Sequence, residues 1–78
     1  MVLAHLHRID PNANMARFYC IDLAPTLFGE VTVLRHWGRL GTCGRTHSET
    51  WPSEGEAEAA ALRTLRQKSR RGYRAAER

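Results

Sequence analysis

The sequence predicts a small α+β fold, an antiparallel sheet of about four strands in meander order packed against one C-terminal α-helix. Apolar residues alternate with polar ones along four segments that turn-forming residues separate. A helix-start signal follows the last segment, and apolar residues then recur at helical spacing. The length of 78 residues suits a single small core. We expect one domain over residues 1–78, with the sheet at roughly 2–51 and the helix at roughly 54–71.

The first two strands are predicted at residues 2–9 and 17–23. The segment 10–14, Asp-Pro-Asn-Ala-Asn, is rich in turn formers and ends the first strand. Alternation along the second strand places Phe18 and Cys20 on one face and Tyr19, Ile21 and Leu23 on the other. The next segment, 24–29, is a connection in which we expect Leu27 and Phe28 to be tucked inward.

The third strand is predicted at residues 31–40 and the fourth at 45–51. Along the third, Trp37 and Arg39 point the same way, about 7 Å apart at two residues' spacing. The sequence Gly-Thr-Cys-Gly at 41–44 predicts the turn between these strands. Neighbouring strands then run antiparallel, as a meander requires.

The helix is predicted from its two ends. Ser53 and Glu56 have the spacing of a capping box, and Gly72 is placed where a left-handed residue ends a helix. Four apolar residues recur at helical spacing and are expected to pack on the sheet: Ala57, Ala61, Leu62 and Leu65. Arginines fall on another face of the helix.

The net charge of +4 is unevenly spread along the chain. Residues 63–78 hold seven basic side chains and one acid, whereas residues 1–62 hold five basic and seven acidic ones. Such a basic end is typical of nucleic-acid binding, and a solvated helix face is the alternative reading. Hydrophobic residues at 42% and charged residues at 26% are ordinary for a globular protein.

The run Arg-His-Trp-Gly-Arg-Leu-Gly-Thr-Cys-Gly-Arg at 35–45 suits contact with a polyanion. Guanidinium groups pair with phosphate, an indole stacks on a sugar or base, and glycines allow close approach of another backbone. The residues predicted to contact phosphate are Arg35, Arg45, Lys68, Arg70 and Arg71. Two structural alternatives stay open, because Trp37 also suits the core of the sheet and Arg39 also suits bracing of the 41–44 turn.

Other kinds of site are not predicted. Cys20 and Cys43 are too few for a disulfide framework, and without an apolar signal segment we expect free thiols in a reducing cytoplasm. No stretch is apolar enough to span a membrane. His5 and His7 share a strand face, but metal-ligand spacings are missing, and a Cys43–His47 pair lacks a cleft and an orienting acid. We expect no metal, no cofactor, no catalytic residue and no small-molecule substrate.

The chain resembles the WGR domain family, which is named for the triplet found here as Trp37-Gly38-Arg39. Further segments follow the family's pattern in order: Asp10-Pro11, Asn14 to Tyr19, Leu27-Phe28-Gly29, Arg35 to Thr42, and Lys68 with Arg71-Gly72-Tyr73. The resemblance spans nearly the whole chain. Leu40 departs from the family's isoleucine or valine, and Arg45 departs from its common glutamine.

The resemblance, to a stand-alone bacterial WGR domain, implies a small antiparallel sheet with one helix and a regulatory role known from poly(ADP-ribose) polymerases. There the domain helps to recognise DNA ends, with the triplet tryptophan against sugar and the arginine supporting DNA and interdomain contacts. The resemblance marks Trp37, Gly38 and Arg39 for this role. Because no polymerase domain accompanies them, we expect sequence-independent binding of DNA ends or breaks rather than catalysis. A protein partner for the same surface is the alternative.

Overall fold

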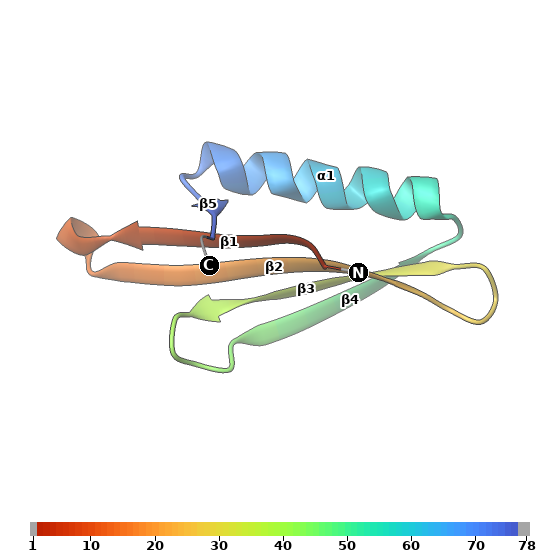
Figure 1. Ribbon diagram of the computed structural model, residues 1–78, viewed down its shortest axis with the longest axis horizontal. Helices are drawn as coiled ribbons and strands as arrows, with labels where there is room; N and C mark the ends of the chain where they lie inside the picture. Colours follow the sequence, from red (N-terminus) through yellow and green to blue (C-terminus); the bar gives the residue numbers. More distant parts are fainter. Residues whose placement is uncertain (1, 77–78) are drawn as a thin grey trace.

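The computed structural model describes residues 2–76. Besides a turn of 3-10 helix at Pro11–Ala13, its elements follow the order β1, β2, β3, β4, α1, β5 along the chain (Figure 1). Their bounds are Val2–Asp10, Met15–Pro25, Val31–Arg39, Arg45–Trp51, Glu54–Arg70 and Arg74–Ala75. The strands form one antiparallel sheet in the order β4-β3-β2-β1-β5. The predicted α+β class and the meander of β1 to β4 are confirmed.

The sheet has a fifth strand that the sequence did not predict. After the helix, the chain returns to the outer edge of β1, where Leu6 faces Ala75 and His7 faces Arg74. The Ala76 amide extends this pairing by donating to the His5 carbonyl at 2.8 Å. A strand of two residues is too short for any alternation of polar and apolar side chains, so only tertiary pairing reveals it.

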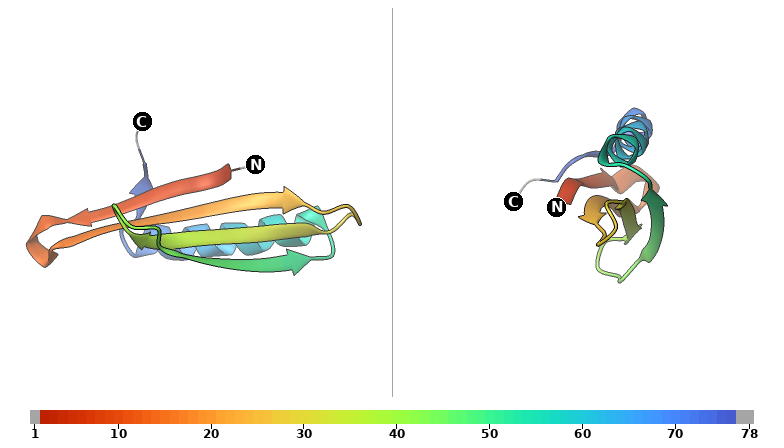
Figure 2. Two further views of the ribbon diagram at one scale, coloured as in Figure 1. Left: turned by 90° about the horizontal axis from the view of Figure 1, so that it is seen from below. Right: turned by 90° about the vertical axis from the view of Figure 1, so that its right-hand side faces the viewer.

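Helix α1 covers one face of the sheet and packs on β2, β3 and β4 (Figures 1 and 2). At its start the Ser53 hydroxyl accepts from the Glu56 amide at 3.3 Å and donates to the Glu56 carboxylate at 3.2 Å. The predicted cap is therefore present, although the carboxylate bonds to the hydroxyl. At its end Gly72 has φ +95°, and the Tyr73 amide bonds back to the Lys68 carbonyl at 3.0 Å.

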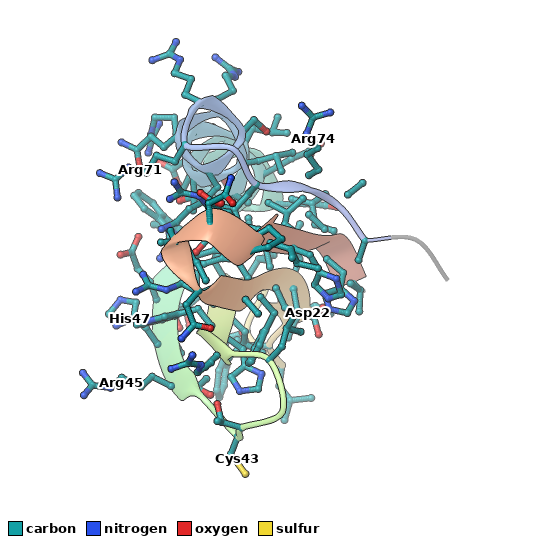
Figure 3. The ribbon with its side chains drawn as sticks, turned by 90° about the vertical axis from the view of Figure 1, so that its left-hand side faces the viewer. Asp22, Cys43, Arg45, His47, Arg71 and Arg74 are labelled. Atoms are coloured by element: carbon teal, nitrogen blue, oxygen red, sulfur yellow. The ribbon has the colours of Figure 1, made fainter. Side chains whose placement is uncertain are left out.

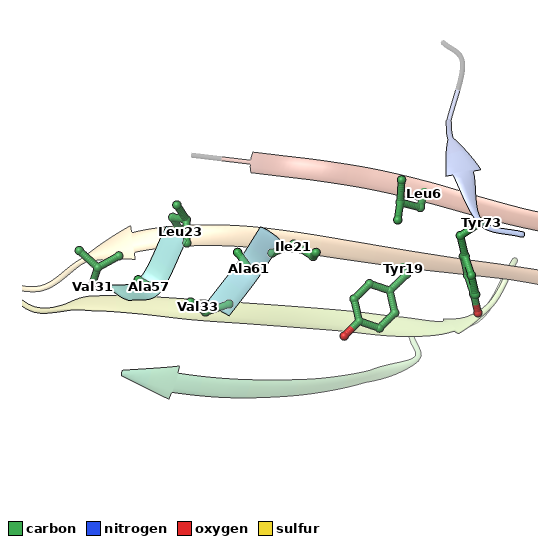
Figure 4. Close-up of a cluster of buried hydrophobic side chains, with 9 residues drawn as sticks. All are labelled: Leu6, Tyr19, Ile21, Leu23, Val31, Val33, Ala57, Ala61 and Tyr73. Atoms are coloured by element: carbon green, nitrogen blue, oxygen red, sulfur yellow. The ribbon is translucent and has the colours of Figure 1, made fainter. Parts of the chain in front are cut away.

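The hydrophobic core lies between α1 and the sheet (Figure 4). Ile21 and Val33 are fully buried at its centre, and Ala57 and Ala61 bring the helix close to them. The cluster comprises Leu6, Tyr19, Ile21, Leu23, Val31, Val33, Ala57, Ala61 and Tyr73. The predicted face of β2 is confirmed by Tyr19, Ile21 and Leu23. Leu65 packs at the margin of this cluster and Leu62 is half-buried.

The turn between β3 and β4 folds against the opposite face of the sheet and buries Phe18 there. A side chain at Gly44 would collide with the Trp37 carbonyl oxygen and come within 2.8 Å of the Phe18 ring. His36 packs edge-on against Phe18, with ring centroids 5.1 Å apart, and its Nε2 bonds to the Cys43 carbonyl. Phe18 thus anchors the turn, and Gly44 is required at this position.

The expectation that Leu27 and Phe28 turn inward is wrong. Their side chains are 97% and 87% exposed at the tip of the β2–β3 hairpin. The strands run on to Pro25 and Val31, so the five residues between them reverse direction beyond the end of the sheet. No element among residues 2–76 covers that tip, because α1 begins only beside its base, at Glu54.

Candidate nucleic-acid interface

Trp37 is half-buried and stacked, so it packs against the core without being enclosed by it. It lies directly opposite Tyr19 across β2 and β3, and their rings stack with centroids 5.9 Å apart and planes 19° apart. Tyr19 itself is only 6% exposed and belongs to the core. The core therefore holds the indole in a fixed orientation while part of its surface stays open to solvent.

Three arginines form a row across the sheet beside this stack. Arg8 on β1 faces Arg17 on β2, and Arg17 faces Arg39 on β3. All three share the face of Trp37, since every second residue of a strand points the same way. Like charges directly opposite each other are unfavourable. Within residues 2–76, neither this row nor the adjoining row of Leu6, Tyr19, Trp37 and Arg45 contains an acid.

The sequence predicted only Arg39 of this row. Arg8 and Arg17 were missed, because one stands within the first predicted strand and the other at the edge of the second, 22 residues from Arg39. Their alignment depends on the register of two hairpins, which no local pattern specifies. The available signal was a basic residue near the end of the first predicted strand, at the start of the second and near the end of the third, since these ends meet in an antiparallel meander.

A hollow adjoins the row beside Arg17 and Arg39. It is about 170 Å³ in volume and is lined by Arg17, Arg39, the end of the β1–β2 turn at 13–14 and the start of β2 at 15–16. An Arg39 Nη2 donates to the Asn14 carbonyl at 3.5 Å across it. At about 30 Å³ per water molecule, the hollow holds several waters or a small oxyanion. Two guanidinium groups therefore border a space suited to an anion.

Lys68 brings the end of α1 onto the same surface. Its Nζ lies 4.6 Å from the centre of the Tyr19 ring and 5.5 Å from that of Tyr73, within the range of cation–π attraction. Burial lowers the pKa of Lys68, and the positive charges of Arg71 and Arg17 lower that pKa further. Lys68 lies over Tyr19, which is two residues from Arg17 on the same face of β2, so the helix end and the arginine row form one basic surface.

Arg35 is positioned differently from the other predicted phosphate contacts. It is half-buried, and its Nε donates to the Thr64 hydroxyl of α1 at 3.3 Å. Thr64 in turn bonds to the Ala60 carbonyl at 3.3 Å. Arg35 thus ties β3 to the helix, and its charge also acts to lower the pKa of Tyr19, which burial raises more strongly. Its first role is structural.

The remaining predicted residues lie at the margin of the basic surface. Arg45 faces Trp37 from the start of β4 and is exposed. Figure 3 shows Arg45, His47 and Arg71 projecting from the same side of the molecule. Arg70 is exposed in the last turn of α1. The structure thus brings Arg45 and Arg71 to the same side, while no hydrogen bond or ion pair with another residue of 2–76 ties the Arg70 side chain to that surface.

Gly38, between Trp37 and Arg39, has a packing role. An added Cβ there would lie 2.6 Å from the Gly44 Cα and 3.4 Å from the Phe18 ring. The backbone of the β3–β4 turn therefore rests directly on that of Gly38. This contact leaves no room for a side chain between the tryptophan and the arginine of the triplet.

The histidines and cysteines form no obvious chemical centre. His5 and His7 pack edge to face at 5.0 Å between ring centroids. Among residues 2–76, no three His, Cys, Asp or Glu side chains come together as a group that could hold a metal ion. Cys20 is half-buried, and burial raises its pKa, whereas Cys43 is exposed in the β3–β4 turn.

The profile of the WGR domain family matches residues 2–78. The chain belongs to the WGR domain family. It is also 44% identical over 70 residues to the uncharacterised protein y4dW of Sinorhizobium fredii (strain NBRC 101917 / NGR234). That match covers 90% of this chain and 34% of the relative, so the chain spans about a third of the relative's length. No solved structure gives a significant match.

Membership of the WGR family confirms the resemblance drawn from the motifs. The family is associated with nucleic-acid binding in poly(ADP-ribose) polymerases. The WGR triplet lies where β3 carries the half-open indole and the end of the arginine row. In the part of the chain that the structure describes, no helix is long and apolar enough to cross a membrane.

Proposed function

We propose that this WGR domain binds DNA without sequence preference and recognises duplex ends or breaks. The observation that carries the proposal is the row of Arg8, Arg17 and Arg39 beside the half-open Trp37. Aligned like charges without an acid among them disfavour the free fold, and phosphate oxygens would relieve that repulsion while forming charge-assisted hydrogen bonds.

The preference for ends follows from the indole. An aromatic side chain needs an exposed sugar or base face to stack on, and a continuous duplex offers mainly its phosphates and groove edges. A terminus exposes both a stacking face and phosphates, which matches an indole next to a basic surface. Residues 2–76 offer no free α-helix to enter a groove, since α1 packs on the sheet, so we assign the domain shape and backbone recognition.

We further propose that the domain acts as a binding module and not as an enzyme, with no cofactor, and that it works in the cytoplasm. The Trp37 stack and the arginine row form an open surface, and the hollow beside them is about 170 Å³. Such a site positions a polyanion and has no enclosed space that excludes water from a reaction. A protein partner for the same surface remains the second candidate, because Trp and Arg are enriched at interface hot spots.

The test is fluorescence anisotropy of a labelled blunt duplex at two salt concentrations. Competitors are unlabelled blunt duplex, closed circular DNA, single-stranded DNA and RNA of equal nucleotide concentration. Wild type is compared with Trp37→Ala and Arg17→Gln, and Arg63→Gln is the control, since Arg63 is an exposed arginine of α1 outside the row. Folding of each variant is checked by circular dichroism.

We expect the affinity for the labelled duplex to fall steeply as salt is raised. Blunt duplex should displace the label better than closed circular DNA does, and Trp37→Ala should lower the affinity. Loss of one stacking contact costs about 1–3 kcal/mol. Each lost phosphate contact makes the slope of log K against log salt shallower by about 0.9. Absence of binding at low salt would overturn the proposal, and salt-insensitive binding to a protein would favour the second candidate.

A further inference from the structure

A second surface lies at the opposite end of the molecule from the basic one. At the tip of the β2–β3 hairpin, Leu27 and Phe28 are 97% and 87% exposed. Single exposed apolar residues are common on protein surfaces. Two adjacent large apolar residues at a projecting tip form a contiguous exposed apolar patch, and such patches mark interaction sites.

The tip has a defined conformation. The Thr26 amide donates to the Glu30 carbonyl at 2.9 Å, and the Phe28 amide donates to the Thr26 hydroxyl at 3.3 Å. Gly29 has φ +82°, a left-handed conformation that completes the reversal. The turn therefore presents Leu27 and Phe28 outward in a fixed arrangement, which lowers the entropy lost when a partner binds them.

The surroundings of the tip are acidic. The segments 22–34 and 49–62 contain six acids and no lysine or arginine. The fold brings these segments together, because Val31 pairs with Trp51 and Val33 with Glu49. Glu54 borders a hollow of about 310 Å³ at the base of the hairpin, beside Pro25 and Val31. Glu30 lies in the tip itself and is exposed.

The tip is separate from the basic surface. Arg17 and Pro25 are eight residues apart on β2, so the strand alone separates them by about 27 Å at its usual rise. The molecule extends 46 Å along its longest axis. Figure 1 shows the β2–β3 turn at the end of the sheet away from the β1–β2 turn. A nucleic acid held at the arginine row would leave the tip uncovered.

We propose that Leu27 and Phe28 dock into an apolar pocket of a protein partner whose rim carries basic side chains. The apolar pair supplies the anchor, as hot-spot residues do at the centre of an interface. The acids around it, Glu30 and Glu54 foremost, select a partner of opposite charge. The same acids repel phosphates and anionic lipid headgroups, so nucleic acid and membrane surfaces fit this end poorly.

The partner is identified by photocrosslinking in cells of the source organism. Phe28 is replaced by p-benzoylphenylalanine in the full chain, and the matched control carries the same amino acid at the exposed position Arg63. A protein crosslinked from position 28 alone is then purified. Its affinity is measured for wild type, Phe28→Ser, Glu30→Lys and Trp37→Ala, and blunt-duplex affinity is measured for the same four proteins.

We expect Phe28→Ser to lower the affinity for the purified partner by about 30-fold, the size typical of a hot-spot residue. Glu30→Lys should also lower the affinity for the partner, whereas Trp37→Ala should leave that affinity unchanged. Phe28→Ser should leave the affinity for the duplex unchanged. This pattern separates the tip from the proposed DNA function, since either can fail alone.

Four results would overturn the inference. The first is the absence of a crosslink specific to position 28, and the second is equal affinity of the purified partner for wild type and Phe28→Ser. The third is sedimentation that shows self-association of wild type but not of Phe28→Ser. The fourth is binding of wild type, but not of Phe28→Ser, to vesicles of phosphatidylcholine with phosphatidylserine.

Discussion

At the scale of single residues, Tyr19 organises the candidate interface. Its ring stacks on Trp37 on one strand and lies beneath the Lys68 ammonium from the helix. Tyr19 is buried and Trp37 is not, so the packed ring supports the open one. The tyrosine thereby connects the core of the fold to the surface that would meet a ligand, and side chains around it carry both stability and binding.

The arginine row predicts a trade between stability and binding. Arg17→Gln removes the middle charge and with it two like-charge pairs, so the free energy of unfolding should rise by about 0.2–1 kcal/mol for each pair. Thermal unfolding at low salt measures the gain, which should shrink in 1 M salt because the charges are screened. Duplex binding should weaken in the same variant. A loss of stability at low salt, with Arg63→Gln unchanged, would contradict this account.

Lys68 predicts a pH dependence whose sign follows from its lowered pKa. The folded protein binds the Lys68 proton less tightly than the unfolded chain, whose lysine has its ordinary pKa of 10.5. The charged lysine therefore costs stability at neutral pH, and this cost is relieved as pH rises from the folded pKa toward the unfolded one.

Denaturant unfolding between pH 7 and 10.5 measures this effect. Wild type should gain stability with pH relative to Lys68→Met and Lys68→Arg, neither of which titrates at position 68 in that range. Parallel pH profiles for all three proteins would show that Lys68 has the same pKa in both states.

At the scale of elements, the turns decide how the strands are presented. The β3–β4 turn folds onto Gly38 and Phe18, and this packing holds the WGR triplet in place. The β2–β3 turn instead extends beyond the sheet and contacts little. Both use glycines with positive φ, yet only the first is packed against the backbone of a neighbouring strand.

This difference predicts unequal effects of the same substitution. Gly29→Ala places a Cβ in open space and should cost about 1–2 kcal/mol for its left-handed backbone alone. Gly44→Ala adds collisions with the Trp37 carbonyl and the Phe18 ring, so it should cost distinctly more. Denaturant unfolding compares the two, and tryptophan fluorescence should change only in Gly44→Ala. Equal losses of unfolding free energy in the two variants would show that the β3–β4 turn rearranges to accommodate the added methyl group.

At the scale of the whole molecule, charge is divided along the long axis. Six of the eight acids lie in segments that meet at the hairpin-tip end, and the arginine row and Lys68 lie at the other. A polyanion approaching from solution is therefore attracted to one end and repelled from the other. Such a field orients the molecule before contact.

The charge division predicts a rate effect that depends on ionic strength. Glu58 is an exposed acid in the second turn of α1, within the acidic segment 49–62. Combining Glu30→Gln with Glu58→Gln should speed duplex association at 0.01 M salt, where the Debye length of about 30 Å exceeds the separation of the two ends along β2. At 0.15 M salt, with a Debye length of about 8 Å, the rate should match wild type. Stopped-flow anisotropy measures both, and Arg39→Gln is the control that slows association in each. Equal acceleration at both salts would argue against long-range steering.

The sequence by itself determined β1 to β4 and α1, and the direction of side chains within each, but not β5. Alternation placed Trp37 and Arg39 on one strand face, Ser53 began the helix, and Gly72 ended it, because each of these signals acts within a few residues. Tertiary structure alone decided how separate elements align. The arginine row, the Lys68 contact with Tyr19, the exposure of Leu27 and Phe28, and the meeting of the acidic segments all depend on register and on what covers each surface. Those are set by the pairing of residues far apart in the chain, which local spacing does not encode.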